Sequence, residues 1–252
     1  MTSPRAVAVV GFKDSGKTRV VEALVSELTR RGYTVGTLKH TAENADFDTP
    51  GKDTMRHREA GAKATAILHD RAAAIFLDGH VAVADAVRSL GPLDFLIIEG
   101  FKTLDTHARI LVPRKDDDVD QLRNGLEIAT VKIPGSVYRG AGANVMELSE
   151  AKKLTDIVEA KAYPILPGAD CHGCGYTDCR GLGKAILAGD AQATLCARNY
   201  TAFTLKVNGE PVPLNSFVRK ALANMLAGFI KALKGGEDAK TVELAFEVET
   251  DG

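Results

Sequence analysis

Residues 11–18, Gly-Phe-Lys-Asp-Ser-Gly-Lys-Thr, have the types and spacing of a phosphate-binding loop. In the pattern Gly-x4-Gly-Lys-Ser/Thr, glycines let backbone amides curl around a phosphate without a Cβ in the way. Lys17 then reaches the terminal phosphates, so we count it as catalytic, and the Thr18 hydroxyl can ligate Mg²⁺. The residues that we expect to bind the nucleotide here are Gly11, Lys13, Asp14, Ser15, Gly16, Lys17 and Thr18.

The segments on either side of this loop fit the motif. Residues 6–10 form an apolar run typical of a buried parallel strand, and residues 18–31 carry apolar side chains on one helical face. The start of that helix would add its dipole and unpaired amides to the phosphate site. Strand, glycine loop and helix together favour nucleotide binding over a chance glycine-rich turn.

A carboxylate follows a second apolar run. Residues 95–98, Phe-Leu-Ile-Ile, indicate a buried strand that leads into Glu99. Ligands of open α/β sheets bind at the carboxyl ends of the strands. We therefore expect Glu99 near Thr18, as a catalytic carboxylate that holds Mg²⁺ or positions water.

All four cysteines lie in one segment, as Cys171, Cys174, Cys179 and Cys196. One compact loop with three cysteines and a distant fourth suits a [4Fe–4S] cluster, in which three thiolates come from one loop. A structural zinc site with four cysteines is the runner-up, because such sites usually use two separate Cys-x2–4-Cys pairs. Disulfides are a third interpretation, disfavoured because an intracellular nucleotide-binding protein sits in a reducing compartment.

Alternating strand and helix signals predict an α/β fold of the P-loop NTPase class, with a mainly parallel sheet and helices on both faces. The closing helix of the sheet domain is expected to be capped by Ser149. Besides the elements above, strands are expected over 33–40, 64–69, 72–77, 109–112 and 128–131, and helices over 50–60, 81–90 and 149–162.

Prolines at 164 and 167 indicate a domain boundary. We expect a nucleotide-binding domain over 1–163 and a small α+β domain with the four cysteines over 164–252. The predicted elements of the small domain are a helix over 182–188, a hairpin over 201–214 that turns at Asn208-Gly209, a helix from Asn215 or Ser216 to 234, and a strand over 242–248.

The composition sets limits on the function. The chain has 252 residues, is 45% hydrophobic and 26% charged, and carries a formal net charge of −1. That charge gives no basic field for nucleic acid or an anionic membrane. No apolar run approaches the ~18–20 residues of a membrane span, and strand one begins too early for a signal peptide. We expect a cytoplasmic protein that binds neither nucleic acid nor membrane.

Four segments, residues 11–18, 38–40, 46–62 and 94–102, together resemble the molybdopterin-guanine dinucleotide biosynthesis protein B family. The resemblance covers residues 1–160 and implies a GTP-binding accessory factor, usually dimeric, with weak Mg²⁺-dependent GTPase activity. It also implies a protein partner, the enzyme that joins guanylate to molybdopterin. Two departures are the single His40, where family members often carry several histidines, and the added cysteine segment, which loosely resembles modules with iron–sulfur ligands.

The resemblance favours two more cofactor-binding residues, Asp48 and Lys52, although a solvated acidic loop is the alternative for the first. Asp48 would belong to a loop that closes over phosphate and Mg²⁺, and Lys52 could bind a second anion such as a pterin phosphate.

Two functions stay open. One is a GTP-binding homodimeric factor for molybdenum or tungsten cofactor maturation, and the other is a nucleotide-gated iron–sulfur redox or metal-delivery protein for a client metalloenzyme. The residues alone do not choose between GTP and ATP.

Overall fold

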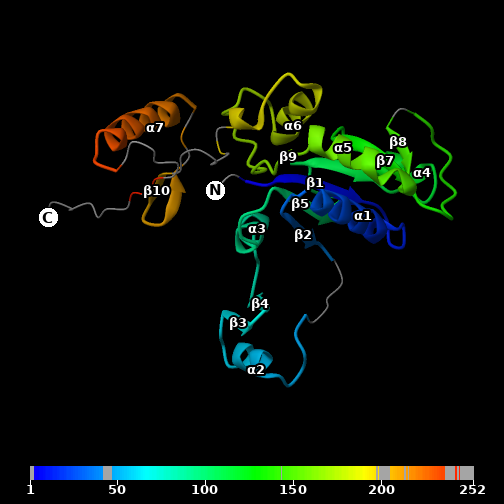
Figure 1. Cartoon of the computed structure of the whole chain (residues 1–252), viewed down its shortest axis with the longest axis horizontal. Helices are drawn as coiled ribbons and strands as arrows, with labels where there is room; N and C mark the ends of the chain where they lie inside the picture. Colours follow the sequence, from blue (N-terminus) through cyan, green and yellow to red (C-terminus); the bar gives the residue numbers. More distant parts are fainter. Residues whose placement is uncertain are drawn as a thin grey trace.

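A mainly parallel sheet organises the chain (Figure 1). Its strand order is β2-β5-β1-β6-β7-β8, with β9 antiparallel to β1. The strands are β1 Arg5–Val10, β2 Val35–Lys39, β5 Phe95–Glu99, β6 Ala108–Leu111, β7 Glu127–Lys132, β8 Val145–Glu147 and β9 Tyr163–Pro164. This computed structural model describes residues 3–41, 47–142, 144–196, 198, 205–212, 214, 216–235, 242 and 244.

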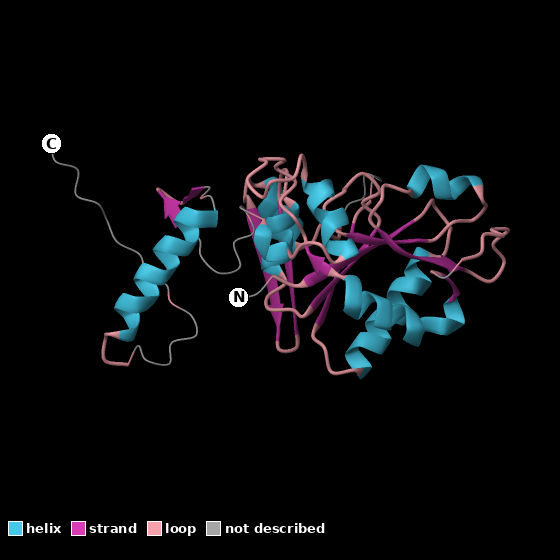
Figure 2. Ribbon diagram, turned by 90° about the horizontal axis from the view of Figure 1, so that it is seen from above, coloured by secondary structure: helices cyan, strands magenta, loops and turns pink. Residues whose placement is uncertain are grey.

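Helices cover both faces of the sheet, which confirms the predicted α/β class (Figure 2). Alternate residues of β1 point to opposite faces, as the strand period of two requires. On one face, Val7 and Val9 pack in a cluster with α1 (Lys17–Arg30) and α5 (Ala151–Lys161). On the other, Ala6, Ala8 and Val10 pack with α3 (Val83–Ser89) and α4 (Asp117–Leu122). β1 is therefore buried on both of its faces.

Strands β3 (Ala64–His69) and β4 (Ala72–Leu77) lie where the sequence predicts strands, yet they pair with each other in a separate antiparallel hairpin. Together with α2 (Asp53–Glu59) they form a lobe that stands away from the main sheet in Figure 1. Nearly every residue of the two strands is exposed.

The cap predicted at Ser149 is wrong. A 3-10 turn, Leu148–Glu150, leads into α5, and Glu147 and Glu150 form a reciprocal capping box there. The Glu150 carboxylate accepts the backbone N–H of Glu147 at 3.1 Å. The two carboxylates thus satisfy the amides of Glu147 and Glu150, whereas Glu150, the residue before α5, makes no side-chain cap hydrogen bond to α5 itself.

The region after residue 164 contains α6 (Cys179–Ala188), β10 (Leu205–Val207), β11 (Glu210–Val212) and α7 (Ser216–Lys231). The turn at Asn208-Gly209 is confirmed, and both residues have left-handed φ angles of 52° and 83°. Helix α6 begins three residues before the predicted start, and α7 ends before the predicted residue 234. Asn215 and most of the predicted strand over 242–248 lie outside the described residues. In the part of the chain that is described, none of the helices combines the length and the apolar character that a bilayer span requires.

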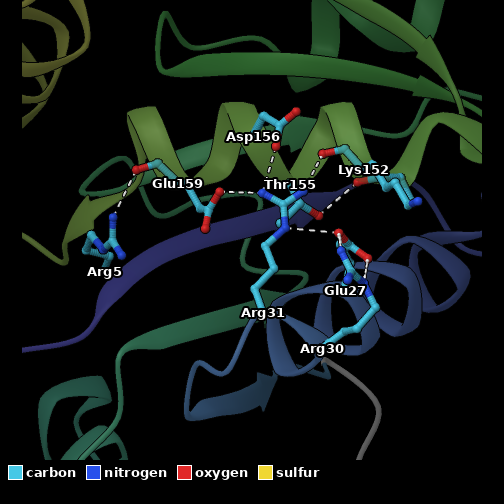
Figure 3. A network of polar contacts seen from close by, with 9 residues as sticks. Arg5, Glu27, Arg30, Arg31, Lys152, Thr155, Asp156 and Glu159 are labelled. Carbon is cyan, nitrogen blue, oxygen red and sulfur yellow. Dashed lines mark hydrogen bonds and ion pairs between the residues drawn. The ribbon is translucent and has the colours of Figure 1, made fainter.

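Arg31, just after α1, joins α1 to α5 (Figure 3). Its guanidinium donates to Glu27 at 3.0 Å, to Asp156 at 2.7 Å and to Glu159. Hydrogen bonds from Arg30, followed by those from Arg31, lower the pKa of Glu27 to about 2. This charged seam holds α5, the last helix before the cysteine segment, against the first helix of the fold.

The low pKa of Glu27 predicts a pH-dependent contribution to stability. Its carboxylate stabilises the fold fully above its ordinary pKa of 4.5, and this contribution is lost as the pH falls toward about 2. We expect Glu27→Gln to lower the urea midpoint of unfolding at pH 6 and to lower it progressively less toward pH 3. Urea titrations across that range measure the difference, with Glu22→Gln on the exposed side of the same helix as the control. An equal loss at every pH would contradict the assignment.

Candidate functional site

The phosphate loop connects β1 to α1 at the carboxyl edge of the sheet. Gly16 has a φ of 87°, and a Cβ there would lie 2.9 Å from the Ile133 side chain. A Cβ on Gly11 would lie 2.6 Å from the carbonyl oxygen of Val112. Val112 and Ile133 directly follow β6 and β7. The loop therefore needs both glycines because it is seated against the ends of two neighbouring strands.

Lys17 lies across the phosphate loop. Its Nζ donates to the carbonyl oxygen of Phe12 at 2.6 Å. Burial lowers the pKa of Lys17 below its ordinary value; the nearby Glu99 opposes this shift, while Lys102 and Lys39 add to it. The ammonium is thus bound to a neutral carbonyl and lies near other cations. An anionic phosphate would offset the repulsion among these positive charges.

Ser15 and its neighbours complete the loop. The Ser15 side chain is buried, and its Oγ has no hydrogen-bond partner among the described residues. Lys13 and Asp14 are exposed on the loop's outer side, and Asp14 has a left-handed φ of 59°. A buried hydroxyl without a partner costs free energy, so it fits a loop that gains a hydrogen bond when a ligand binds.

Thr18 and Glu99 are in direct contact. The Thr18 hydroxyl donates to Glu99 Oε1 at 3.1 Å, and Lys39 Nζ lies 3.2 Å from the same oxygen. The parallel pairing of β1 with β5 places Val9 opposite Glu99, so the carboxylate reaches the start of α1. The two oxygens that the sequence predicts as Mg²⁺ ligands therefore lie side by side, although their metal-binding role stays a prediction.

Cations that the sequence analysis missed lie beside the phosphate loop and Glu99. Lys102 Nζ lies 4.4 Å from the centre of the Phe12 ring, and Arg114 Cζ lies 5.0 Å from it. Lys39 ends β2, and Lys102 and Arg114 follow β5 and β6. Their shared place at the carboxyl ends of strands is the signal that could have found them. Together with Lys17 they create a site of positive potential for a polyanion.

Asp48 and Lys52 belong to the segment that leads into α2, and Figure 1 shows α2 away from the main sheet. Asp48 Oδ1 accepts hydrogen bonds from the Thr54 hydroxyl at 2.9 Å and from the amide of Thr49 at 2.8 Å. Lys52 is exposed. The structure does not bring these two residues to the phosphate loop, and their predicted role in cofactor binding stays a prediction.

The cysteine segment packs against the main sheet. Cys179 is the first residue of α6, and Cys196 follows the 3-10 turn Ala193–Leu195. Both are buried in the hydrophobic cluster that includes β1 and α1. Cys174 is partly buried against that cluster, whereas Cys171 is exposed. Helix α6 starts at Cys179 because the Asp178 carboxylate caps it by accepting the amide of Gly181.

Backbone amides surround the sulfur of Cys179. Burial raises the pKa of the Cys179 thiol and the Asp170 side chain adds to this, while the backbone amides of Asp170, Ala169 and Gly168 oppose the shift by donating hydrogen bonds to the sulfur. Amide donors of this kind stabilise metal-bound thiolates, and thiolates are soft ligands suited to iron–sulfur clusters or zinc. The Asp170 carboxylate accepts the amide of Cys179 at 2.7 Å, which folds the loop back onto α6.

The four cysteines are all outside disulfide bonds. Among the residues that the structure describes, no group of three or more His, Cys, Asp or Glu side chains is arranged to hold a metal ion. The donor types therefore fit an iron–sulfur or zinc site, but the predicted ligand set of Cys171, Cys174, Cys179 and Cys196 is not assembled in this conformation and stays a prediction.

Two models of protein families match the chain. The one described as "Molybdopterin guanine dinucleotide synthesis protein B" matches residues 6–132, just over half of the chain. The one described as "Putative Fe-S cluster" matches residues 166–198, which contain all four cysteines. The two matches fall on the two regions in which the sequence and the structure show chemically suited residues.

Known proteins resemble both regions. A relative from Methanocaldococcus jannaschii, named "Putative molybdopterin-guanine dinucleotide biosynthesis adapter protein", is 29% identical over 250 residues, which cover 97% of this chain and 98% of the relative. One component of the ion-translocating oxidoreductase complex of Cereibacter sphaeroides is 44% identical over 48 residues, 19% of this chain and 23% of that protein. The crystal structure of Bacillus subtilis MobB shares the fold, with a TM-score of 0.52 and 23% identity over 61% of this chain and 97% of that one.

Proposed function

Because the chain belongs to the molybdopterin guanine dinucleotide synthesis protein B family, we propose that it is a GTP-binding accessory factor in the biosynthesis of molybdenum or tungsten pterin guanine dinucleotide cofactors. The observation that carries the proposal is the phosphate loop with Thr18 against Glu99 beside it. The name of the archaeal relative, which spans both halves of this chain, supports the same pathway.

The loop residues define how a nucleotide would be held. The amides of residues 13–18 and the start of α1 would bind the phosphates, and Lys17 would exchange the Phe12 carbonyl for a phosphate oxygen. Thr18 and Glu99 would hold Mg²⁺, which neutralises charge on the phosphates. Slow GTP hydrolysis, which the family resemblance implies, completes this part of the proposal. The preference for GTP comes from the family alone.

The second part of the proposal is a [4Fe–4S] cluster ligated by Cys171, Cys174, Cys179 and Cys196. Its support is the match of residues 166–198, the thiol donors, and the amides directed at the Cys179 sulfur. The four thiolates would gather when the metal binds. Zinc is the competing occupant. The similarity to a component of an oxidoreductase complex favours a second candidate function, a nucleotide-gated redox or metal-delivery protein for a client metalloenzyme.

The third part is a homodimer that acts with the guanylate-transferring enzyme as its partner. The β3–β4 hairpin exposes Leu68 by 80%, Ile75 by 56% and Ile67 by 54%, and its strands contain no Asp, Glu, Lys or Arg. A hairpin of two strands is at best marginally stable alone, and uncharged edges readily pair with further strands. A second copy of the same hairpin would cover these apolar side chains.

Lys17→Ala tests nucleotide binding. We expect about a 10- to 100-fold loss of affinity for Mg²⁺–GTP with the fold intact, because one charge-assisted contact to the terminal phosphates is removed. Isothermal titration calorimetry measures the affinity, and Lys153→Ala on the exposed side of α5 is the matched control. Affinity within a few-fold of the parent would refute the proposed phosphate site. Equal competition by ATP would remove only the preference for guanine.

Cys196→Ser tests the cluster. Protein reconstituted without oxygen should be brown and carry about four irons and four sulfides per chain. The variant should lose most of its iron, while His172→Ala, inside the same loop, should keep it, because four thiols already suffice. Visible absorption and iron analysis provide the readout. Colourless anaerobic protein with one zinc per chain would show that the occupant is zinc.

Leu68→Asp tests the homodimer. A buried charge at the contact between two hairpins should convert the dimer to a monomer in light scattering after gel filtration. Val137 is another highly exposed apolar residue, in the loop after β7, so Val137→Asp is the matched control and should stay dimeric. A monomeric parent protein would be incompatible with this part of the proposal.

A further inference from the structure

The loop of residues 100–107, between β5 and β6, contacts both the phosphate site and the cysteine segment. It starts directly after Glu99, and its Lys102 lies 4.4 Å from the Phe12 ring of the phosphate loop. At its other end, the carbonyl of Thr106 accepts the amide of Leu166 at 2.9 Å, two residues before Gly168. One short loop thus joins the two candidate sites.

Arg109 holds this loop from inside the protein. Its side chain is only 2% exposed although it is charged, because it belongs to β6 in the middle of the sheet. The guanidinium donates to the carbonyl oxygens of Lys102 at 3.5 Å, of Leu104, and of Leu122 at 2.9 Å. Burying a guanidinium costs desolvation free energy. Arg109 is not among the residues proposed to bind the nucleotide or the metal, so its burial calls for another role. Its contacts fix the path of the loop on the side of Lys102.

Asp105 connects the other end of the loop to the start of α6. Its carboxylate lies 3.8 Å from Arg180, the residue that follows Cys179. It is also near enough to Arg109 for the two charges to attract each other. The neighbouring Thr106 packs against Gly168, whose amide points to the Cys179 sulfur. Asp105 and Thr106 therefore contact two neighbours of Cys179, namely Arg180, which follows it in the chain, and Gly168, whose amide donates to its sulfur.

We propose that the 100–107 loop couples metal binding at Cys179 to nucleotide binding at the phosphate loop, with Arg109 as the residue that positions it and Asp105 as its charged link. This inference rests on the proposed function, because it needs both ligands. Metal-bound thiolates add negative charge beside Arg180 and compete with Asp105 for it. Asp105, with one of its two cationic partners drawn away, then adds more negative charge at the loop that carries Lys102. The metal-loaded protein consequently binds the anionic nucleotide more weakly, and by linkage the nucleotide weakens metal binding by the same factor.

The test compares the affinity for Mg²⁺–GTP of anaerobic protein loaded with iron and sulfide and of the same protein stripped by a chelator. We expect about fivefold weaker binding to the loaded form, at the low end of typical couplings because the pair of Asp105 and Arg180 is half exposed. In Asp105→Asn both ligands should still bind, and the ratio of the two affinities should approach one. Asp85→Asn, which breaks an exposed Asp–Arg pair on α3, should keep the parent ratio.

Arg109→Lys tests the positioning role of Arg109, because a purely structural role would change the stability of the protein but not the ratio of the two nucleotide affinities. Lysine keeps the positive charge but cannot hold three carbonyls, so the ratio should shrink while the melting temperature shows a folded protein. A ratio of one in the parent, with both ligands bound, would overturn the coupling and leave the proposed function intact. A ratio that survives in Asp105→Asn would overturn the route. Absence of nucleotide or metal binding in the parent would overturn the proposed function and the coupling with it.

Discussion

The fold depends on one steric constraint, the seating of the phosphate loop against the ends of β6 and β7. Gly11 and Gly16 leave no room for a Cβ, so the loop, two strand ends and the start of α1 have one relative arrangement. The register of β1 with β5 then brings Glu99 to Thr18. Cations at the ends of β2, β5 and β6 lie at this same edge because parallel strands end there together.

Short sequence patterns correctly predict most of the elements that form the candidate site. The phosphate loop, the buried strand before Glu99 and the turn at Asn208-Gly209 are each encoded within about ten residues, and the structure confirms all three elements. Periodicity does not predict the pairing of β3 with β4 outside the main sheet, since it indicates a strand but not the strand with which it pairs. The start of α6 was placed too late because Gly181 and Gly183 weaken the helix signal that Asp178 restores by capping.

The packing around the cysteines could not be predicted from the sequence. Their spacing predicts a shared ligand, but burial of Cys179 and Cys196 beside β1 depends on contacts across more than 160 residues. Contacts with β1 are made on both sides of the proposed domain boundary at residue 163. Tyr163 pairs with Ala6, and Leu166 lies in the same hydrophobic cluster as Val7. Buried groups such as Arg109 are equally invisible in sequence, where an arginine in a strand is expected to face water.

The shared core has a consequence for the biogenesis of this protein. Its hydrophobic cluster uses the first strand and also Leu182 and Cys196, so it cannot close until nearly the whole chain up to that cysteine has been synthesised. Once it closes, two of the thiols are covered. Insertion of the proposed metal would therefore have to precede this closure on the newly made chain, or else wait for local unfolding of the segment around α6.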